Sequence, residues 1–174
     1  MKTLLIIGAG GHGKVVAEIA STNGYDKVAF LDDNSSEAIG KINELERFKD
    51  HFEETFVGIG NNVVRKELIC KLENTGYEIP VLIHPTAYIS KSAEISAGTV
   101  IEPHAVVNAN SIIGKGCIVS VGAIVDHNSV LQDYVHVNAG AIISAGANIK
   151  TYKKVKVEAG EVIPGYGINL SVEK

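Results

Sequence analysis

The chain has 174 residues, of which 16 are Lys or Arg and 20 are Asp or Glu, so its net charge is −4. This length suggests one domain or two small ones, and the acidic balance argues against a nucleic-acid-binding protein, which usually has a basic excess. Hydrophobic residues make up 45% of the chain, which is enough for a core and excludes a disordered polypeptide. The two cysteines, Cys70 and Cys117, do not make a disulfide framework, and a reducing cytosol fits them best.

Residues 1–80 are predicted to form a small α/β domain. Apolar runs predict strands at 4–7, 28–31 and 55–59, and helical spacing of apolar residues predicts helices over 14–23 and 61–74. The alternation of strands and helices indicates a parallel sheet covered by helices. The first apolar run is too short for a signal peptide or a membrane span, so a soluble, cytoplasmic protein without membrane insertion is expected.

A glycine-rich motif follows the first predicted strand. Residues 8–13 match the pattern G-x-G-x-x-G, in which glycines let the backbone approach a phosphate and the following helix offers free N–H groups. Asp32 and Asp33 end the second strand about 20 residues later, as in a dinucleotide site, but the domain is only about half a dinucleotide fold and a mononucleotide fits better. Residues 58–62 and Arg65 should converge on the same crevice. A tight turn without a ligand is the alternative.

Residues 81–174 contain a six-residue repeat. Every sixth residue from Ile83 to Val155 is aliphatic, and the residue four places after each is small or β-branched in twelve of thirteen cases. A period of six fits neither an α-helix nor a series of hairpins, and it predicts a solenoid whose coil has three short flat sides. Both repeated residues should point inward, with coils stacked roughly 4.8 Å apart.

Further apolar residues of the repeat are expected to face outward. In a monomer they would be exposed, and apolar patches of this kind mark interfaces between subunits. They are Val106, Ile112, Ile118, Ile124 and Ile142.

The repeat resembles that of the hexapeptide-repeat acyltransferases, which form a left-handed parallel β-helix, and this resemblance supplies the hand. Over residues 3 to about 150, the succession GAGGHGKVVAEIA, FLDDN, VGIGNNVVRKEL and LIHPTAYIS is similar to the bacterial nucleotide-sugar acetyltransferases of the PglD and NeuD types. The resemblance implies transfer of an acetyl group from acetyl-CoA to the amino group of a UDP-linked amino sugar in surface-glycan biosynthesis. O-acetylation of sialic acid or another sugar is the alternative reaction.

The resemblance also implies individual binding residues. Those that would contact the nucleotide sugar are Gly11, His12, Gly13, Asp32, Asp33 and Gly60. Those that would bind acetyl-CoA are His136, Ala145 and Val157.

His127 is the histidine best placed for chemistry. It lies mid-hexad, where the chain faces outward, and histidine suits removal of a proton from an attacking nucleophile near neutral pH. The resemblance assigns it the role of catalytic base. The family commonly has an acidic residue directly after this histidine, where this chain has Asn128. Asp126 precedes it and could serve instead, although neighbours in a strand face opposite ways.

His127 and His136 should lie on different walls of one coil, so a homotrimer with sites between subunits is expected. His84 and His104 are expected to be structural, and no metal is expected because the histidines lack the short spacing of metal ligands. The repeat decays after Ile149 in a lysine-rich segment, which suggests a shortened acetyl-CoA groove. A non-catalytic sugar-nucleotide-binding protein is therefore the alternative from another class.

Overall fold

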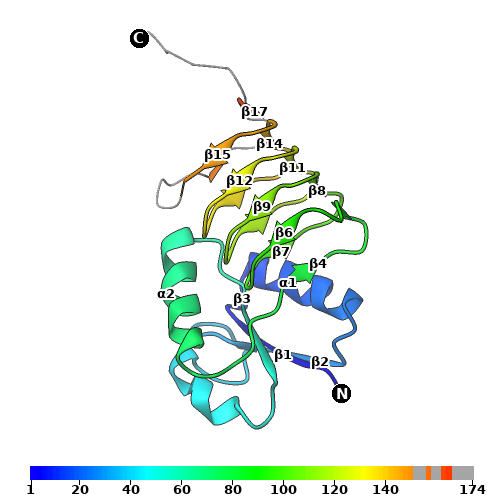
Figure 1. Ribbon diagram of the computed structural model, residues 1–174. Helices are drawn as coiled ribbons and strands as arrows, with labels where there is room; N and C mark the ends of the chain where they lie inside the picture. Colours follow the sequence, from blue (N-terminus) through cyan, green and yellow to red (C-terminus); the bar gives the residue numbers. More distant parts are fainter. Residues whose placement is uncertain (151–155, 158–161, 166–174) are drawn as a thin grey trace.

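The computed structural model of the chain describes residues 1–150, 156–157 and 162–165, which form an α/β part and a parallel solenoid stacked on it (Figure 1). The sheet of the α/β part has the order β2-β1-β3 and consists of β1 (Thr3–Ile7), β2 (Lys27–Leu31) and β3 (Glu54–Val57). The central strand β1 is buried along its whole length, which explains its uninterrupted apolar sequence. The three strands were predicted to within two residues at each end.

Two helices accompany the sheet, α1 (Gly11–Thr22) and α2 (Asn62–Glu73). Helix α1 begins inside the glycine motif, three residues before the predicted start. The prediction missed this first turn because it contains no apolar residue on which helical spacing could be recognised. Helix α2 is capped by Asn61, whose side-chain oxygen accepts two backbone N–H groups of the first turn. A 3-10 segment, η1 (Ile42–Phe48), was not predicted; its apolar residues recur every third position, which is the period of such a helix.

The solenoid has three walls of two-residue parallel strands. Wall 1 contains β4 (Leu82–Ile83), β7 (Val100–Ile101), β10 (Ile118–Val119), β13 (His136–Val137) and β16 (Lys156–Val157). Wall 2 contains β5 (Tyr88–Ile89), β8 (Val106–Val107), β11 (Ile124–Val125), β14 (Ile142–Ile143) and β17 (Val162–Ile163). Wall 3 contains β6 (Glu94–Ile95), β9 (Ile112–Ile113), β12 (Val130–Leu131) and β15 (Asn148–Ile149). Up to β15, paired strands are 18 residues apart, so each coil is three hexads as predicted.

Both repeated positions fill the interior of the solenoid. Aliphatic residues such as Val119 and Val137 are fully buried, and so are small residues such as Ala123 and Cys117. Where the small residue is polar, its hydroxyl donates to a backbone carbonyl at the same corner of the following coil, as Ser111 does to Asp126 at 2.8 Å. The buried hydroxyl is thereby satisfied without interrupting the packing.

The register of the repeat shifts after β15. Val137 pairs with Val157, a step of 20 residues rather than 18. Val155 itself, like most of the lysine-rich segment, lies outside the described residues. The step could not be predicted because the hexad spacing alone continues unbroken to Val155.

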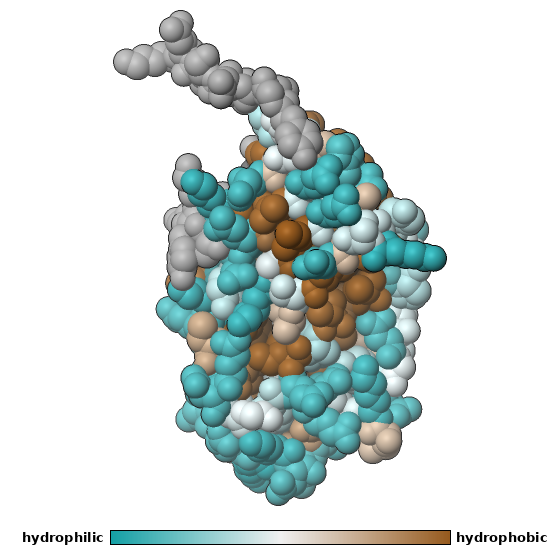
Figure 2. All heavy atoms as spheres, viewed as in Figure 1, coloured by the Kyte–Doolittle hydropathy of each residue, from teal (hydrophilic) through white to brown (hydrophobic). Residues whose placement is uncertain are grey.

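Helix α1 packs across wall 1, and this corrects one expectation about the outward-facing residues. Ile118 is only 1% exposed, because it shares a core with Val16 and Ile19 of α1. Ile112 on wall 3 is 45% exposed, and Val106, Ile124 and Ile142 on wall 2 are partly exposed. Apolar atoms gather along the solenoid surface in Figure 2. The outward apolar face is therefore confirmed for walls 2 and 3 but not for wall 1.

Candidate functional site

The glycine motif places three of the predicted binding residues at the carboxyl edge of the sheet. A Cβ on Gly13 would lie 2.0 Å from the carbonyl oxygen of Gly8, so this glycine is needed for α1 to pack against the loop. Gly11 and Gly60 instead border open space, with no atom within 4 Å of a Cβ. Because Gly10 supplies no side-chain cap to α1, the N–H groups of the first turn remain available to an anion.

Asp32 anchors this loop. Its Oδ2 accepts the backbone N–H of Ala9 at 2.9 Å, and its Oδ1 accepts those of Asn34 and Ser35. These bonds, that of Ala9 first, hold the pKa of the Asp32 carboxyl below its usual range. Asp33 is exposed, and its carboxylate accepts the backbone N–H of Ile42 at 3.1 Å. The two aspartates lie at the predicted edge, and Asp32 contributes directly to the shape of the glycine loop.

His12 links the glycine motif to the solenoid. Its Nδ1 lies 3.5 Å from Oε1 of Glu102, whose Oε2 accepts the backbone N–H of Val121 at 3.0 Å. Burial, together with the nearby charge of Arg65, lowers the pKa of His12 to about 4, and burial raises the pKa of Glu102. His12 is therefore a neutral imidazole at pH 7 and adds no positive charge to an anion held at the helix N-terminus.

Arg65 does not lie in the crevice, where it was expected. It is 1% exposed and sits between the α/β part and the solenoid. Its guanidinium donates to the carbonyl oxygens of Ile59 and Gly60 on one side and of Gly116 and Tyr134 on the other. The sequence placed Arg65 one helical turn after the sheet edge but could not show which way its side chain turns.

His136 extends the outer face of wall 1 beyond the part that α1 covers. It pairs in register with Ile118, and its Nε2 lies 3.0 Å from Oγ of Ser120. Ser120 occupies the position equivalent to that of Glu102 in the next coil, since the two residues are 18 apart in the chain. Glu102 and Ser120 were not assigned from the sequence. A charged residue in a repeat that contains few charges, and its position one coil below Ser120, were the available signals.

His127 lies at the exposed corner between walls 2 and 3. The amide nitrogen of Asn128 is 2.9 Å from its Nδ1. Asp126 does not take that place, because its Oδ1 accepts the backbone N–H of His127 at 2.7 Å and the side-chain amide of Asn108 at 3.0 Å. These bonds keep the pKa of Asp126 low and fix the corner that carries the histidine. Asn128 has a φ of +56°, a conformation that asparagine tolerates better than most residues.

The predicted acetyl-CoA residues separate into two places. Ala145 lies one coil above His127, 18 residues later in the chain, and the neighbouring Gly146 donates its N–H to the His127 carbonyl at 2.9 Å. His136 lies on wall 1, where Val157 pairs with Val137. A single chain therefore presents His127 and Ala145 at one corner and His136 on the opposite wall of the triangular coil.

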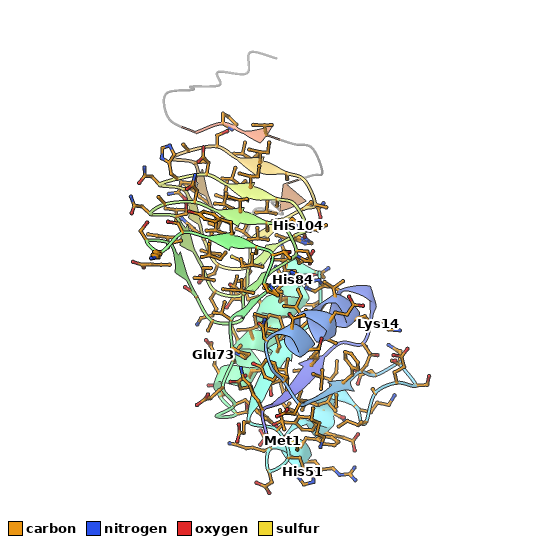
Figure 3. All side chains as sticks on the ribbon, turned by 90° about the vertical axis from the view of Figure 1, so that its right-hand side faces the viewer. Met1, Lys14, His51, Glu73, His84 and His104 are labelled. Atoms are coloured by element: carbon orange, nitrogen blue, oxygen red, sulfur yellow. The ribbon has the colours of Figure 1, made fainter. Side chains whose placement is uncertain are left out.

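The remaining histidines of the solenoid have local roles. Nδ1 of His84 lies 2.8 Å from Oγ1 of Thr86, and His104 forms a turn with a φ of +60°. Figure 3 shows the two one above the other on the side of the solenoid next to α1. Over the ranges that the structure describes, no three His, Cys, Asp or Glu side chains are grouped to hold a metal ion. In the same ranges, no helix has the length and apolar character that crossing a bilayer requires.

Known proteins resemble both parts of the chain. Residues 3–72 match the PglD N-terminal domain. A curated UDP-N-acetylbacillosamine N-acetyltransferase of Bacillus subtilis strain 168 is 36% identical over 112 residues, which cover 58% of this chain and 51% of that protein. The match thus spans about half the length of this curated relative.

Solved structures extend the similarity across the solenoid. The acetyltransferase domain of PglB from Neisseria gonorrhoeae FA1090 is 39% identical with a TM-score of 0.81, over 85% of this chain and 76% of that one. The same domain in complex with acetyl coenzyme A gives a TM-score of 0.80. A histidine-to-alanine variant of GDP-perosamine N-acetyl transferase from Caulobacter crescentus, with CoA and GDP-perosamine, is 28% identical with a TM-score of 0.82, over 85% and 74%. The fold is the predicted one, a left-handed parallel β-helix joined to a Rossmann-like part.

Proposed function

The chain belongs to the PglD-type acetyltransferase family, and we propose that it transfers the acetyl group of acetyl-CoA to the amino group of a UDP-linked amino sugar. The observation that carries this proposal is the combination of an uncapped glycine-rich helix start, docked on wall 1, with an exposed histidine on the solenoid corner. Relatives crystallised with acetyl coenzyme A, or with CoA and GDP-perosamine, support the two substrates. UDP is preferred because the curated relative acts on a UDP sugar.

In the proposed reaction the amine nitrogen of the sugar attacks the thioester carbon of acetyl-CoA. His127 removes a proton from this nitrogen, the carbon–sulfur bond breaks, and the proton passes to the departing thiolate. The products are an N-acetylated sugar and free coenzyme A, so no acyl-enzyme is required. Asp126 holds the backbone of the corner and Asn128 contacts the ring, and together they orient the base.

The proposed assembly is a homotrimer that acts in the cytoplasm. Its interface would cover the apolar residues of walls 2 and 3 and of the corner before wall 2, of which Tyr88, Ile112 and Val121 are 59%, 45% and 45% exposed. Each site would combine the nucleotide pocket and His136 of one chain with His127 of the partner subunit. This arrangement is favoured because the two histidines lie on opposite sides of one coil.

Release of free thiol from acetyl-CoA tests the function. We expect saturable release with a UDP-linked amino sugar, less with its GDP counterpart, and none with sialic acid or with a UDP sugar that has a hydroxyl in place of the amine. Release with sialic acid alone would support O-acetylation instead. If no acceptor gives release and calorimetry detects no acetyl-CoA binding, the chain is a non-catalytic nucleotide-sugar-binding protein and the proposal is wrong.

Asn128→Asp tests how the base is oriented and charged. A carboxylate beside the imidazole ring of His127 stabilises the protonated form of that ring. The acid limb of the plot of kcat against pH should therefore move to higher pH by about one unit. The fold should tolerate the change, since Asp also adopts a φ of +56°. Asn148→Asp is the control, because Asn148 is an exposed asparagine of the same solenoid whose side chain accepts a hydrogen bond from Gln132, a role that Asp keeps. Equal shifts in both variants would indicate a general charge effect rather than a contact with His127.

A further inference from the structure

Arg65 is the most completely bonded side chain between the two parts of the molecule. Nε donates to the Gly116 carbonyl at 2.7 Å, and Nη2 donates to Asn62 Oδ1 at 2.8 Å and to the Tyr134 carbonyl at 2.9 Å. Nη1 donates to the carbonyls of Ile59 and Gly60 at 3.1 and 2.9 Å. All five N–H donors of the guanidinium are therefore used.

These bonds are unusual because none of them goes to a carboxylate. Burying a charged group costs free energy, and an apolar side chain of similar volume often docks two surfaces equally well. Burial lowers the pKa of Arg65 to about 10, so the group is still charged at pH 7. A rigid fork with five donors instead fixes the directions of several carbonyl groups at once, which an apolar residue cannot do.

The carbonyl groups that Arg65 holds lie on both sides of the proposed site. Gly60 borders open space at the edge where the nucleotide sugar is expected. Gly116 and Tyr134 are 18 residues apart and occupy the same corner of successive coils. Tyr134 precedes His136 by two residues and has a φ of +63°, a turn conformation that needs support. Arg65 thus connects the nucleotide loop directly to the turn that leads into the strand of His136.

We propose that Arg65 is a positioning residue, which sets the distance between the Gly60 loop and the His136 strand so that the acceptor amine reaches the acetyl group. This inference rests on the proposed function. It assigns to Arg65 no contact with either substrate. Its effect is on the alignment of two half-sites, each of which can bind its own ligand alone.

Arg65→Lys is the test, because lysine keeps the charge but cannot hold carbonyl groups on both sides. We expect kcat to fall about 100-fold, the cost of a misplacement near 1 Å, while the KM for acetyl-CoA stays unchanged. Glu73→Gln is the matched control, since the Glu73–Lys115 ion pair also joins α2 to the solenoid but lies exposed and away from Gly60. It should leave kcat and both KM values unchanged. If Arg65→Lys lowers only the melting temperature and leaves the kcat of the folded protein intact, the proposal is wrong.

Hydrogen exchange gives a readout that does not depend on activity. In Arg65→Lys, amides of residues 59–61 and 132–136 should exchange faster, while those of β1 keep the wild-type rate. If wild type proves inactive with every acceptor, the proposed function fails, and this exchange pattern still decides whether Arg65 couples the two segments. Faster exchange throughout the chain, or no change in either segment, would overturn the inference. Should Arg65→Lys not fold, Asn62→Ala removes one acceptor and should give the same pattern with a smaller loss of kcat.

Discussion

Replacing His127 with alanine is expected to lower kcat for acetyl transfer by about 10²- to 10⁴-fold, the usual contribution of a general base. The fold should not change, because the His127 side chain is exposed and the corner is held by the backbone N–H that Asp126 accepts. Calorimetric binding of the nucleotide sugar should therefore stay at the wild-type level. Thiol release under saturating substrates measures the effect.

His51→Ala is the control for this substitution. His51 is also exposed, but it lies at the end of the molecule opposite the solenoid (Figure 3). This variant should keep full activity. If His127→Ala retained kcat within a fewfold of wild type, the amine would have to lose its proton to water or to another group, and the assignment of the base would be wrong.

The solenoid was predictable because its signal is local and repeated. An inward position must be aliphatic and a corner position must be small in every coil, so residues such as Val119 and Ala123 obey one rule over many periods. The α/β strands were predictable for a similar reason, since a central parallel strand is apolar throughout. The same spacing gives no information about a change in the length of a coil, such as the 20-residue step between the paired residues Val137 and Val157.

The contacts between the two parts could not be predicted from spacing. Ile118 has the same pattern as the outward residues of wall 2, and only the docking of α1 distinguishes it. The same holds for Arg65 and for the approach of His12 to Glu102, in which residues far apart in the chain meet. The resemblance to a family named the site residues, and the hexad spacing already predicted that His127 and His136 divide between different walls of one coil. The structure refines this division to wall 1 for His136 and the opposite corner for His127.

That division leads to the second large effect. His127→Ala and His136→Ala subunits should each form inactive homotrimers, yet mixed trimers should regain activity. In a cyclic trimer, a site made from two neighbouring chains can receive its intact His136 from one variant and its intact His127 from the other. Whichever variant is in excess, a mixed trimer contains one intact site, so about a third of the sites would be intact once purification has removed both homotrimers. Co-expression with two different affinity tags, purification through both tags and thiol release measure the recovery.

Light scattering on each preparation provides the control, because all three must have the mass of a trimer before their activities are compared. If the preparations are trimers and the mixed one remains inactive, both histidines act within one chain, since every chain in the mixture lacks one of them. That result would require the substrate to reach from wall 1 to the corner between walls 2 and 3 around a single coil. The interior of that coil is filled by residues such as Val125 and Val137, so no path through it exists. Recovery near the expected third would instead place each site between two chains, which is also where the exposed Ile112 and Val121 would be covered.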